Sequence, residues 1–316
     1  GEGRWEWEHA ICQRKTDLID GDVRRRGRRV SLTFRRVVGR DGRPLPRVVE
    51  GEKEEDEDPR VTPEVEVRHV RNFYDAASET WHHTRSKRGV LWPSPSAFIS
   101  SLSPGSMVLD VGCGDGKYFS KAVEAGCSCV GVDASLELLK RAGRAKTGPE
   151  KSQSLYGSAA TDAVGGDCVR LPFKNSYFDA ALCVAVMHHL STDARRVRCF
   201  EEILRVVRVG GRCSVHAWAE EQGDGSRRKF GGQDVMVPFN ARMEDLTQED
   251  VELGGGSVVE EKGLVEFERY CHVYREGELE VLADKARGEG GKKRWERVGG
   301  GWEEGNWWVE LVAVSG

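Results

Sequence analysis

The sequence predicts an α/β fold in which helices cover both faces of a mostly parallel, doubly wound sheet. Residues 107–133 combine an apolar run, alternating glycines, a helical segment and a second apolar run. Residues 178–186 are continuously apolar, as in a strand that is buried on both faces. Residues 193–207 place apolar side chains at helical spacing, with arginine and glutamate between them. Five or more strands that alternate with helices are typical of this class.

Charge is distributed unevenly along the 316 residues, although the net charge is only −4. Residues 1–47 carry 13 Lys/Arg and 7 Asp/Glu, a net of +6, whereas residues 50–58 carry 7 acids and one lysine, a net of −6. The acidic stretch and the prolines around it indicate a solvated linker. We therefore expect a small first unit at 1–38, a flexible acidic linker at 39–62 and a large domain at 63–316.

The nine cysteines include no C-x-x-C pair. Several lie in apolar, strand-like runs, which indicates small buried side chains in a reducing compartment and not a disulfide framework or a zinc site. No apolar run approaches 18 residues, so we expect neither a membrane span nor a signal peptide. The chain begins with Gly1 and not with methionine, so we expect further residues ahead of it in the natural protein.

The large domain opens with helical segments. Residues 65–83 can form a helix whose apolar side includes Tyr74. A basic loop at 84–93 and a short helix at 96–102 follow. Two interpretations of Arg85, which lies in that loop, are equally good: an ordinary solvated charge and a functional role.

The alternating glycines form the centre of the predicted site. Asp110 precedes Gly112, Gly114 and Gly116, and Asp133 closes the next apolar run. Glycine lets a loop turn sharply against a ligand, and a helix that begins near Gly116 would favour an anionic group. A carboxylate at the end of the second strand can bind ribose hydroxyls.

The spacing of the loop distinguishes between two cofactors. Dinucleotide sites usually show G-x-G-x-x-G, whereas this loop reads D-x-G-x-G-x-G. An acid beside the glycines suits the cationic end of S-adenosylmethionine, and the loop N–H groups suit its carboxylate. The alternative is a tight strand-to-helix turn that binds no ligand.

The next segments continue the alternation. Ser135 is expected to cap a helix that ends near Ala145. Residues 146–165 are rich in Gly, Ser and Ala without a clear period, and we interpret them as a surface insertion. Asp167 follows, where an acid could receive an adenine amino group, although a turn aspartate is the simpler explanation when it is taken alone.

The apolar run at 178–186 ends in a pair of histidines, His188 and His189. Strand ends are where reacting groups lie in such folds. Adjacent histidines do not chelate from one face, so we expect no metal site and interpret one of the two as structural.

The remaining chain completes the sheet. The glycines at 210–211 are expected to end the amphipathic helix, and a strand at 212–219 then carries Trp218. The bases at 227–229 suit phosphate contact and solvation equally. From Gly263 a strand and a short helix follow. Residues 288–305 are expected to be loop-like, and residues 306–314 are expected to form the last strand. The final two elements are expected to be an antiparallel edge pair.

Several blocks of the large domain, among them MHHLST, HAWAEEQ and HVYREGELE, are more specific than the glycine loop. With them, residues 65–316 resemble the eukaryotic methyltransferase that esterifies 5-carboxymethyluridine at the tRNA wobble position, of the kind fused behind an AlkB-type oxygenase. The resemblance implies a class I Rossmann-like methyltransferase with about seven strands and an antiparallel edge strand.

The resemblance also implies roles for single residues. Cofactor contacts are implied for Tyr74, Asp110, Gly112, Gly114, Asp133, Asp167 and Val186, and substrate contacts for Arg85, His188 and Trp218. Extra residues between Arg85 and Trp92 depart from the family pattern and leave the position of the Arg85 loop open. S-adenosylmethionine is the implied cofactor, without a metal. The implied partners are tRNA and a small zinc-binding activator subunit, and we expect a cytoplasmic protein that is also found in the nucleus.

The first unit resembles another family. WEHAI followed by RRVSLTFRRV is similar to the end of an AlkB-type iron and 2-oxoglutarate oxygenase, which implies roles for His9, Arg29 and Arg35. That family also needs an H-x-D iron pair, and no H-x-D occurs in this chain. One imidazole cannot hold iron, so we interpret residues 1–38 as a truncated remnant without oxygenase activity. The simpler alternative for 29–37 is a basic hairpin that lies on a partner or on RNA.

The implied acceptor is a carboxylate, which is ionised near neutral pH, so no general base is required. Rate enhancement would then come from alignment and removal of water. Arg85 is expected to orient the acceptor, and Trp218 to stack on its base. Two alternatives remain: a methyltransferase of the same fold that acts on a small molecule or a protein, and a non-catalytic RNA-binding relic.

Overall fold

The structure is a computed structural model. It describes residues 58–86, 90–144, 161–223, 225–226, 228–286 and 291–316, together with two short strands near the start of the chain. The chain divides into two compact units, Gly1–Glu52 and Lys53–Gly316.

The described part of the first unit is a hairpin. Strands β1 (Thr16–Ile19) and β2 (Asp22–Arg25) pair in antiparallel register. The basic hairpin considered for 29–37 lies outside the described residues, as do His9, Arg29 and Arg35 and most of the linker expected at 39–62.

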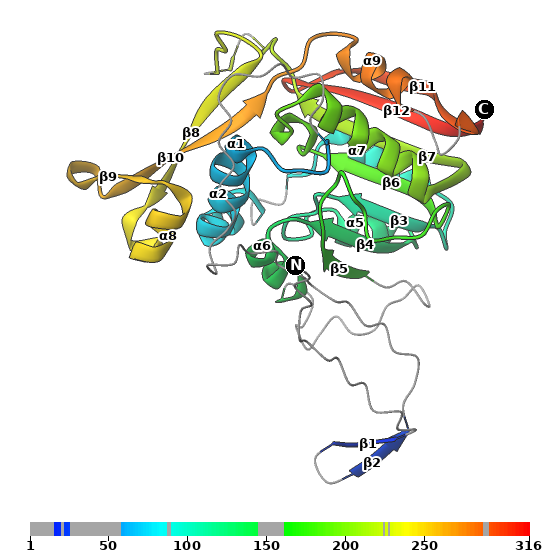
Figure 1. The fold of residues 1–316 in the computed structure, drawn as a ribbon, viewed down its shortest axis with the longest axis horizontal. Coiled ribbons are helices and arrows are strands. Elements are labelled where there is room, and N and C mark those ends of the chain that lie inside the picture. The colour runs from blue at the N-terminus through cyan, green and yellow to red at the C-terminus, as the bar shows by residue number, and fades with distance from the viewer. Residues whose placement is uncertain are drawn as a thin grey trace, which may run out of the picture. The chain divides into compact units, whose positions relative to one another are not determined.

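A seven-stranded sheet forms the centre of the second unit (Figure 1). Its strands are β3 (Met107–Val111), β4 (Ser128–Asp133), β5 (Thr161–Gly165), β6 (Phe178–Val184), β7 (Val207–Trp218), β11 (Lys293–Glu303) and β12 (Asn306–Ser315). They lie in the order β11-β12-β7-β6-β3-β4-β5. The five strands from β7 to β5 are parallel, whereas β12 is antiparallel to both β7 and β11. The predicted fold class, a mostly parallel sheet of about seven strands with an antiparallel last strand, is therefore confirmed. The antiparallel pair at the edge is β11 and β12, although the segment that forms β11 was expected to be loop-like.

Helices cover both faces of this sheet because successive side chains of each strand point to opposite sides. On one face, Leu109 belongs to a core cluster with Phe200 of α7 (Asp193–Val206) and Leu282 of α9 (Glu278–Lys285). On the other face, Val108 belongs to a cluster with Phe119 of α5 (Phe119–Glu124). Helices α4 (Pro93–Ser100) and α6 (Leu136–Arg144) complete that second layer.

Capping side chains define the start of two of these helices. Thr192 Oγ1 accepts a hydrogen bond from Arg195 N at 3.3 Å, at the start of α7. Ser135 Oγ accepts one from Leu138 N at 3.2 Å, at the start of α6. The predicted Ser135 cap is therefore confirmed, since the hydroxyl satisfies an N–H group that has no partner within the helix.

A second, smaller sheet was not predicted. Strands β8 (Asp234–Arg242), β9 (Ser257–Val259) and β10 (Leu264–His272) pair antiparallel in the order β8-β10-β9. Helix α8 (Gln248–Gly254) begins with a capping box between Thr247 and Asp250. Three 3₁₀ turns, η3 (Met187–His189), η4 (Met243–Asp245) and η5 (Glu260–Lys262), lie between the strands and helices of the unit.

The helix expected at 65–83 is a chain of short segments instead. These are α1 (Glu64–Glu66), η1 (Val67–Arg71), α2 (Asn72–Ala76), α3 (Ser78–Trp81) and η2 (His82–Ser86), of which η1 and η2 are π-helical. Phe73 is fully buried against Phe239 and Phe267 of the small sheet, with ring centroids 5.2 and 5.8 Å apart. In Figure 1 these helices lie between the small sheet and the main sheet.

Several predicted boundaries were wrong. Residues 161–165 of the expected surface insertion form the edge strand β5, and most of the expected loop at 288–305 is strand β11. The short helix expected at 96–102 begins earlier, at Pro93, because proline is well tolerated in a first helical turn. The helix after the glycine loop begins at Phe119 and not near Gly116.

The glycines at 210–211 do not end α7, which stops at Val206. The β-branched pair Val206–Val207 leads directly into β7, and the two glycines lie within that strand. Gly210 has a φ of +78°, which only glycine adopts without strain, so it lets the strand bend near its start.

The eight cysteines in the described part of the chain are all free, and seven of them are buried. This agrees with their interpretation as small apolar side chains. Among the helices that the structure describes, none has the length and apolar character needed to cross a membrane.

An ion pair attaches the first helical segment to the main sheet's helical layer. Arg195 Nε donates to Glu66 Oε1 at 3.0 Å, and the two side chains are 2% and 4% exposed. Arg195 Nη1 also donates to Pro59 O and Val61 O, at 2.6 and 3.0 Å. Glu66 accepts a further bond from Ser191 N at 2.7 Å. Breaking such a buried pair leaves an uncompensated charge away from water.

We therefore expect Glu66→Ala to lower the free energy of unfolding by about 3–5 kcal/mol, as for other buried pairs that lose one partner. Glu64→Ala is the matched control because its partner Arg68 is exposed, and it should cost less than about 1 kcal/mol. Urea unfolding followed by circular dichroism measures both. Equal losses for the two variants would contradict a structural role for the buried pair.

Candidate active site

A cavity of about 550 Å³ opens at the carboxyl ends of the parallel strands. Its walls come from the ends of β3, β4, β6 and β7, from the N-terminal helical segments and from β10. Nine of the ten predicted site residues line it: Tyr74, Asp110, Gly112, Gly114, Asp133, Asp167, Val186, His188 and Trp218. The tenth, Arg85, belongs to η2, and its side chain is outside the described part of the structure.

The glycine loop forms one wall of the cavity, and its geometry requires glycine. Gly112 has a φ of +69°, and a Cβ atom there would lie 2.1 Å from Val186 Cγ2. The loop amides were expected to bind an anionic group, but four of them bond within the protein. Gly112 N and Cys113 N donate to Val132 O at 2.7 and 3.1 Å, and Gly116 N donates to Cys113 O at 2.9 Å. The fourth, Gly114 N, donates to Asp133 Oδ2 at 2.7 Å.

Two buried carboxyl groups stand beside this loop. Asp133 accepts backbone hydrogen bonds from Gly114 N and from Ser135 N, at 2.7 and 2.8 Å. Burial raises the pKa of Asp133 to about 6, although these bonds oppose the shift. Burial, and then the nearby Asp133 charge, raise the pKa of Asp110 to about 8. Asp110 Oδ2 is buried without a hydrogen-bond partner in the described part of the chain. A cation in the cavity would satisfy it.

Asp167 lines the cavity, but protein groups already hold its carboxylate. Oδ1 accepts from Val169 N at 3.1 Å, and Oδ2 forms an ion pair with Arg71 and lies 3.4 Å from Arg195 Nη2. The adenine contact predicted for this residue therefore competes with two guanidinium groups for the same oxygen.

His189 is the structural member of the histidine pair. Its Nδ1 lies 2.9 Å from Tyr270 O, and its Nε2 lies 2.8 Å from the hydroxyl of Tyr74. The first contact requires a proton on Nδ1, so Nε2 accepts from the tyrosine. Burial, with the charge of Arg269, lowers the pKa of His189 to about 3. Burial also raises the pKa of Tyr74 to about 12, so both groups are neutral at physiological pH.

His188, His189 and Cys271 offer ligand atoms within 4.8 Å of one another. Both nitrogens of His189 are engaged, as described above, so the trio has at most two available ligand atoms. This geometry does not suit a metal site, which needs three or more protein ligands.

His188 stacks on Trp218, with ring centroids 4.7 Å apart and planes inclined by 25°. Trp218 N donates to His188 Nδ1 at 3.4 Å, so the ring proton lies on Nε2. Burial lowers the pKa of His188 well below its usual range. The imidazole is therefore a neutral donor and a weak base.

Trp218 is already in contact with other planar groups in the cavity wall. Besides His188, the guanidinium of Arg228 lies over its ring at 4.1 Å from the centroid. Arg228 is exposed. A base that stacks on Trp218 must share this ring with the guanidinium or displace it.

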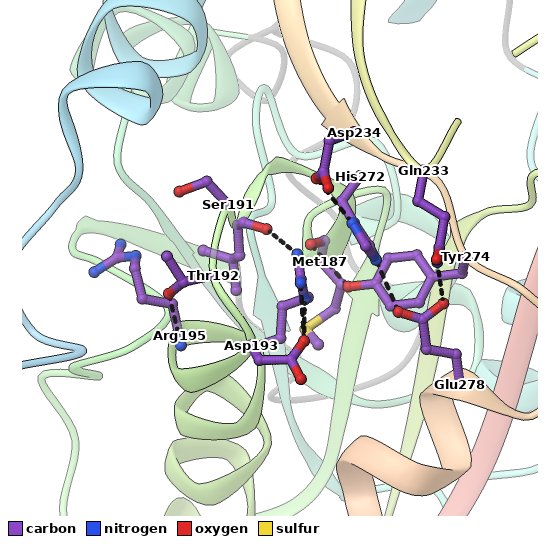
Figure 2. Close-up of polar contacts among 12 residues, drawn as sticks. Met187, Ser191, Thr192, Asp193, Arg195, Gln233, Asp234, His272, Tyr274 and Glu278 are labelled. Atoms are coloured by element: carbon purple, nitrogen blue, oxygen red, sulfur yellow. Dashed lines mark hydrogen bonds and ion pairs between the residues drawn. The ribbon is translucent and has the colours of Figure 1, made fainter. Parts of the chain in front are cut away.

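A polar network on the other side of the histidine turn fixes its position (Figure 2). Tyr274 Oη donates to Met187 O at 3.0 Å, which supports the 3₁₀ turn that carries His188. Nearby, His272 lies between two carboxylates: its Nδ1 is 3.0 Å from Asp234 Oδ1, and its Nε2 is 2.8 Å from Glu278 Oε1. These contacts join β8, β10 and α9 beneath the site.

The cavity also contains residues that the sequence did not identify. The most important is Arg269 on β10, a buried arginine in contact with aromatic rings. Trp81 of α3 and Asp115 of the glycine loop line the cavity as well. Asp115 pairs with His82 at 2.5 Å, which ties the loop to η2. A strand was expected at Arg269, but alternation alone does not show which face meets a cavity.

Residues 109–215 match a family described as "Methyltransferase domain". Among solved structures, the CcbJ methyltransferase from Streptomyces caelestis has a TM-score of 0.54 at 14% identity, over 77% of this chain and 98% of that protein. Phosphoethanolamine N-methyltransferase 1 from Haemonchus contortus has a TM-score of 0.51 at 14% identity, over 78% of this chain and 50% of that protein. These two likenesses support the fold.

Several relatives of known name are called tRNA (carboxymethyluridine(34)-5-O)-methyltransferase. The Arabidopsis thaliana protein is 39% identical over 53% of this chain and 37% of its own length. The Xenopus tropicalis protein, named with the suffix alkbh8, is 26% identical over 98% of this chain and 55% of its own length. This chain thus spans between a third and a little over half of those two relatives. The Schizosaccharomyces pombe protein is 33% identical over 78% of this chain and 96% of its own length. The chain therefore belongs to the tRNA (carboxymethyluridine(34)-5-O)-methyltransferase family.

Proposed function

We propose that this protein transfers a methyl group from S-adenosylmethionine to the carboxylate of 5-carboxymethyluridine at the tRNA wobble position, forming the methyl ester. The observation that carries the proposal is the single cavity lined by all nine predicted site residues whose side chains are described. The names of the relatives, and the cationic and aromatic walls of the cavity, support the choice of acceptor.

The residues of the cavity fit the cofactor. Asp110 has a buried carboxyl oxygen without a partner in the described residues, which suits the cationic end of S-adenosylmethionine. Asp133, at the end of β4, suits the ribose hydroxyls. Gly112 brings the backbone close to the ligand, where a side chain would collide with Val186. When bound, the cofactor supplies a sulfonium methyl group to an oxygen nucleophile.

The chain's own residues would orient the acceptor and exclude water from it. The acceptor carboxylate is ionised near neutral pH, so no proton has to be removed before transfer. The low pKa of His188 agrees with this, because such an imidazole is a poor base. Its Nε2 proton can still donate to an acceptor oxygen. Alignment of two bound reactants is a large source of rate enhancement.

The direct test uses the full chain together with the small zinc-binding activator subunit, which we also propose as its partner. Both are incubated with S-adenosylmethionine and with tRNA that carries 5-carboxymethyluridine. Mass spectrometry of the wobble nucleoside should then show the methyl ester. Unmodified tRNA, acidic peptides and small carboxylic acids form the comparison panel.

Methylation of a peptide or a small molecule in place of the tRNA would assign the chain to another methyltransferase class. Failure to bind S-adenosylmethionine, even with the activator, would favour a non-catalytic RNA-binding protein. Either result would overturn the proposal.

Cofactor affinity should depend on pH through Asp110. Its pKa of about 8 means that most of the free protein carries a protonated carboxyl at neutral pH. A cation binds the ionised form, so affinity should rise by up to about tenfold per pH unit toward pH 8. The sign is opposite for the stability of the free protein. Because the folded pKa is raised, the stabilising contribution of the protonated form is lost as the pH rises through about 8.

Isothermal titration calorimetry between pH 6 and pH 9 measures this linkage. Asp110→Asn should bind S-adenosylmethionine more weakly by at least tenfold and should lose the pH dependence. Asp179→Asn is the matched control, because Asp179 binds Arg208 and Met107 N at the opposite ends of the strands. A pH profile that Asp110→Asn leaves unchanged would remove Asp110 from the cofactor site.

A further inference from the structure

Arg269 is a buried cation in the wall of the cavity. It lies on β10, and only 2% of its surface is exposed. Four aromatic rings surround its guanidinium, with ring centroids at 5.2–5.6 Å from Cζ: Phe73, Trp81, Trp218 and Phe239. These rings come from the N-terminal helices, the small sheet and the main sheet. They stabilise a positive charge through their negative faces, but they are not hydrogen-bond acceptors of ordinary strength.

The hydrogen-bonding groups of Arg269 are incompletely satisfied. Its Nε and Nη1 atoms are buried without a partner, and no carboxylate among the described residues pairs with the guanidinium. Other buried arginines differ in this respect. Arg195 pairs with Glu66, and Arg196 pairs with Asp193 and donates to Leu190 O. A buried charge without a counter-charge is costly, so a site that retains one commonly binds an opposite charge.

The charge of Arg269 acts on the groups that form the rest of the site. After burial, it contributes to the lowered pKa of His189 and, with His189, to that of His188. It also opposes the rise that burial causes in the pKa of Tyr74. Arg269 thus creates a positive potential around the neutral side chains of His188 and Tyr74.

We propose that Arg269 binds the carboxylate of the acceptor and selects an anionic wobble base over a neutral one. This inference rests on the proposed function and identifies the residue that recognises the acceptor. A carboxylate in the cavity would supply the counter-charge and the acceptor oxygens that the described residues do not. A guanidinium edge can hold a carboxylate through two parallel hydrogen bonds. The surrounding rings suit the flat base to which the carboxylate is attached.

The test compares two anticodon stem-loop RNAs that differ only at the wobble position. One carries 5-carboxymethyluridine and the other carries its neutral amide analogue, 5-carbamoylmethyluridine, which cannot form the ester. Competition binding to the full chain, with the activator and S-adenosylhomocysteine present, gives the affinity ratio for the two RNAs. The wild-type protein should prefer the carboxylate by about tenfold to a hundredfold, the usual value of charge-assisted hydrogen bonds.

Arg269→Gln should bring this ratio close to one and should leave the affinity for S-adenosylmethionine unchanged within about twofold. Arg269→Lys keeps the charge but loses the planar fork, so it should retain only part of the preference. Arg275→Gln is the matched control, because Arg275 is exposed and pairs with Glu220, and its ratio should equal that of the wild type. If Arg269→Gln does not fold, the affinity ratio of Arg269→Lys for the two RNAs decides the test.

A full carboxylate preference in Arg269→Gln, or in Arg269→Lys when only that variant folds, would overturn the inference. Measurements on the wild-type protein distinguish a failure of the inference about Arg269 from a failure of the proposed function. Ester formation by a wild-type protein that shows no carboxylate preference would refute the role of Arg269 alone. The absence of any ester product would instead refute the proposed function.

Discussion

The buried ion pair between Glu66 and Arg195 is the contact on which the site depends. The parallel strands provide only the floor of a cavity, because their carboxyl ends open toward solvent in this class of fold. The roof comes from the helical segments at 64–86, which precede the sheet in the sequence. Glu66 fastens the start of this roof to α7, while Phe73 packs its middle against the small sheet. The π-helical turns η1 and η2 flank that middle, and irregular turns of this kind are frequent at functional sites.

The sequence predicts the parallel half of the sheet well, because its signals are local. Strands β3 and β4 begin and end where the apolar runs do, and Asp133 closes β4 as expected. The sequence is less informative at the edges. β11 contains three consecutive glycines, which normally weaken a strand, but here the ring of Trp308 lies against Gly299 and Gly301 and replaces the missing side chains. This compensation is between neighbouring strands, so the composition of β11 alone does not reveal it.

The site likewise contains residues that local sequence patterns predict and residues that only contacts between distant segments bring in. Asp110, Gly112 and Asp133 belong to one continuous motif, so their spacing predicts a cofactor site. Arg269 belongs to no such motif, and it reaches the cavity only because β10 pairs with β8 in a second sheet. The aromatic rings around it come from positions 73 to 239 of the chain. A single arginine in an apolar strand is ambiguous in sequence, and only the folded chain shows that it lacks a carboxylate partner among the described residues.

The cavity therefore contains one buried acid and one buried base, each incompletely paired by the described residues: Asp110 at the glycine loop and Arg269 on β10. In the proposed reaction a sulfonium and a carboxylate become a thioether and an ester, so the acceptor loses its charge. A strong salt bridge to the carboxylate would stabilise the ground state and slow its reaction, because only interactions that are stronger in the transition state than in the ground state accelerate the chemistry. A guanidinium among four aromatic rings moderates this effect, since their negative faces partly satisfy the cation before the acceptor binds. The neutral ester then has little attraction for Arg269, so the same residue that captures the substrate favours release of the product.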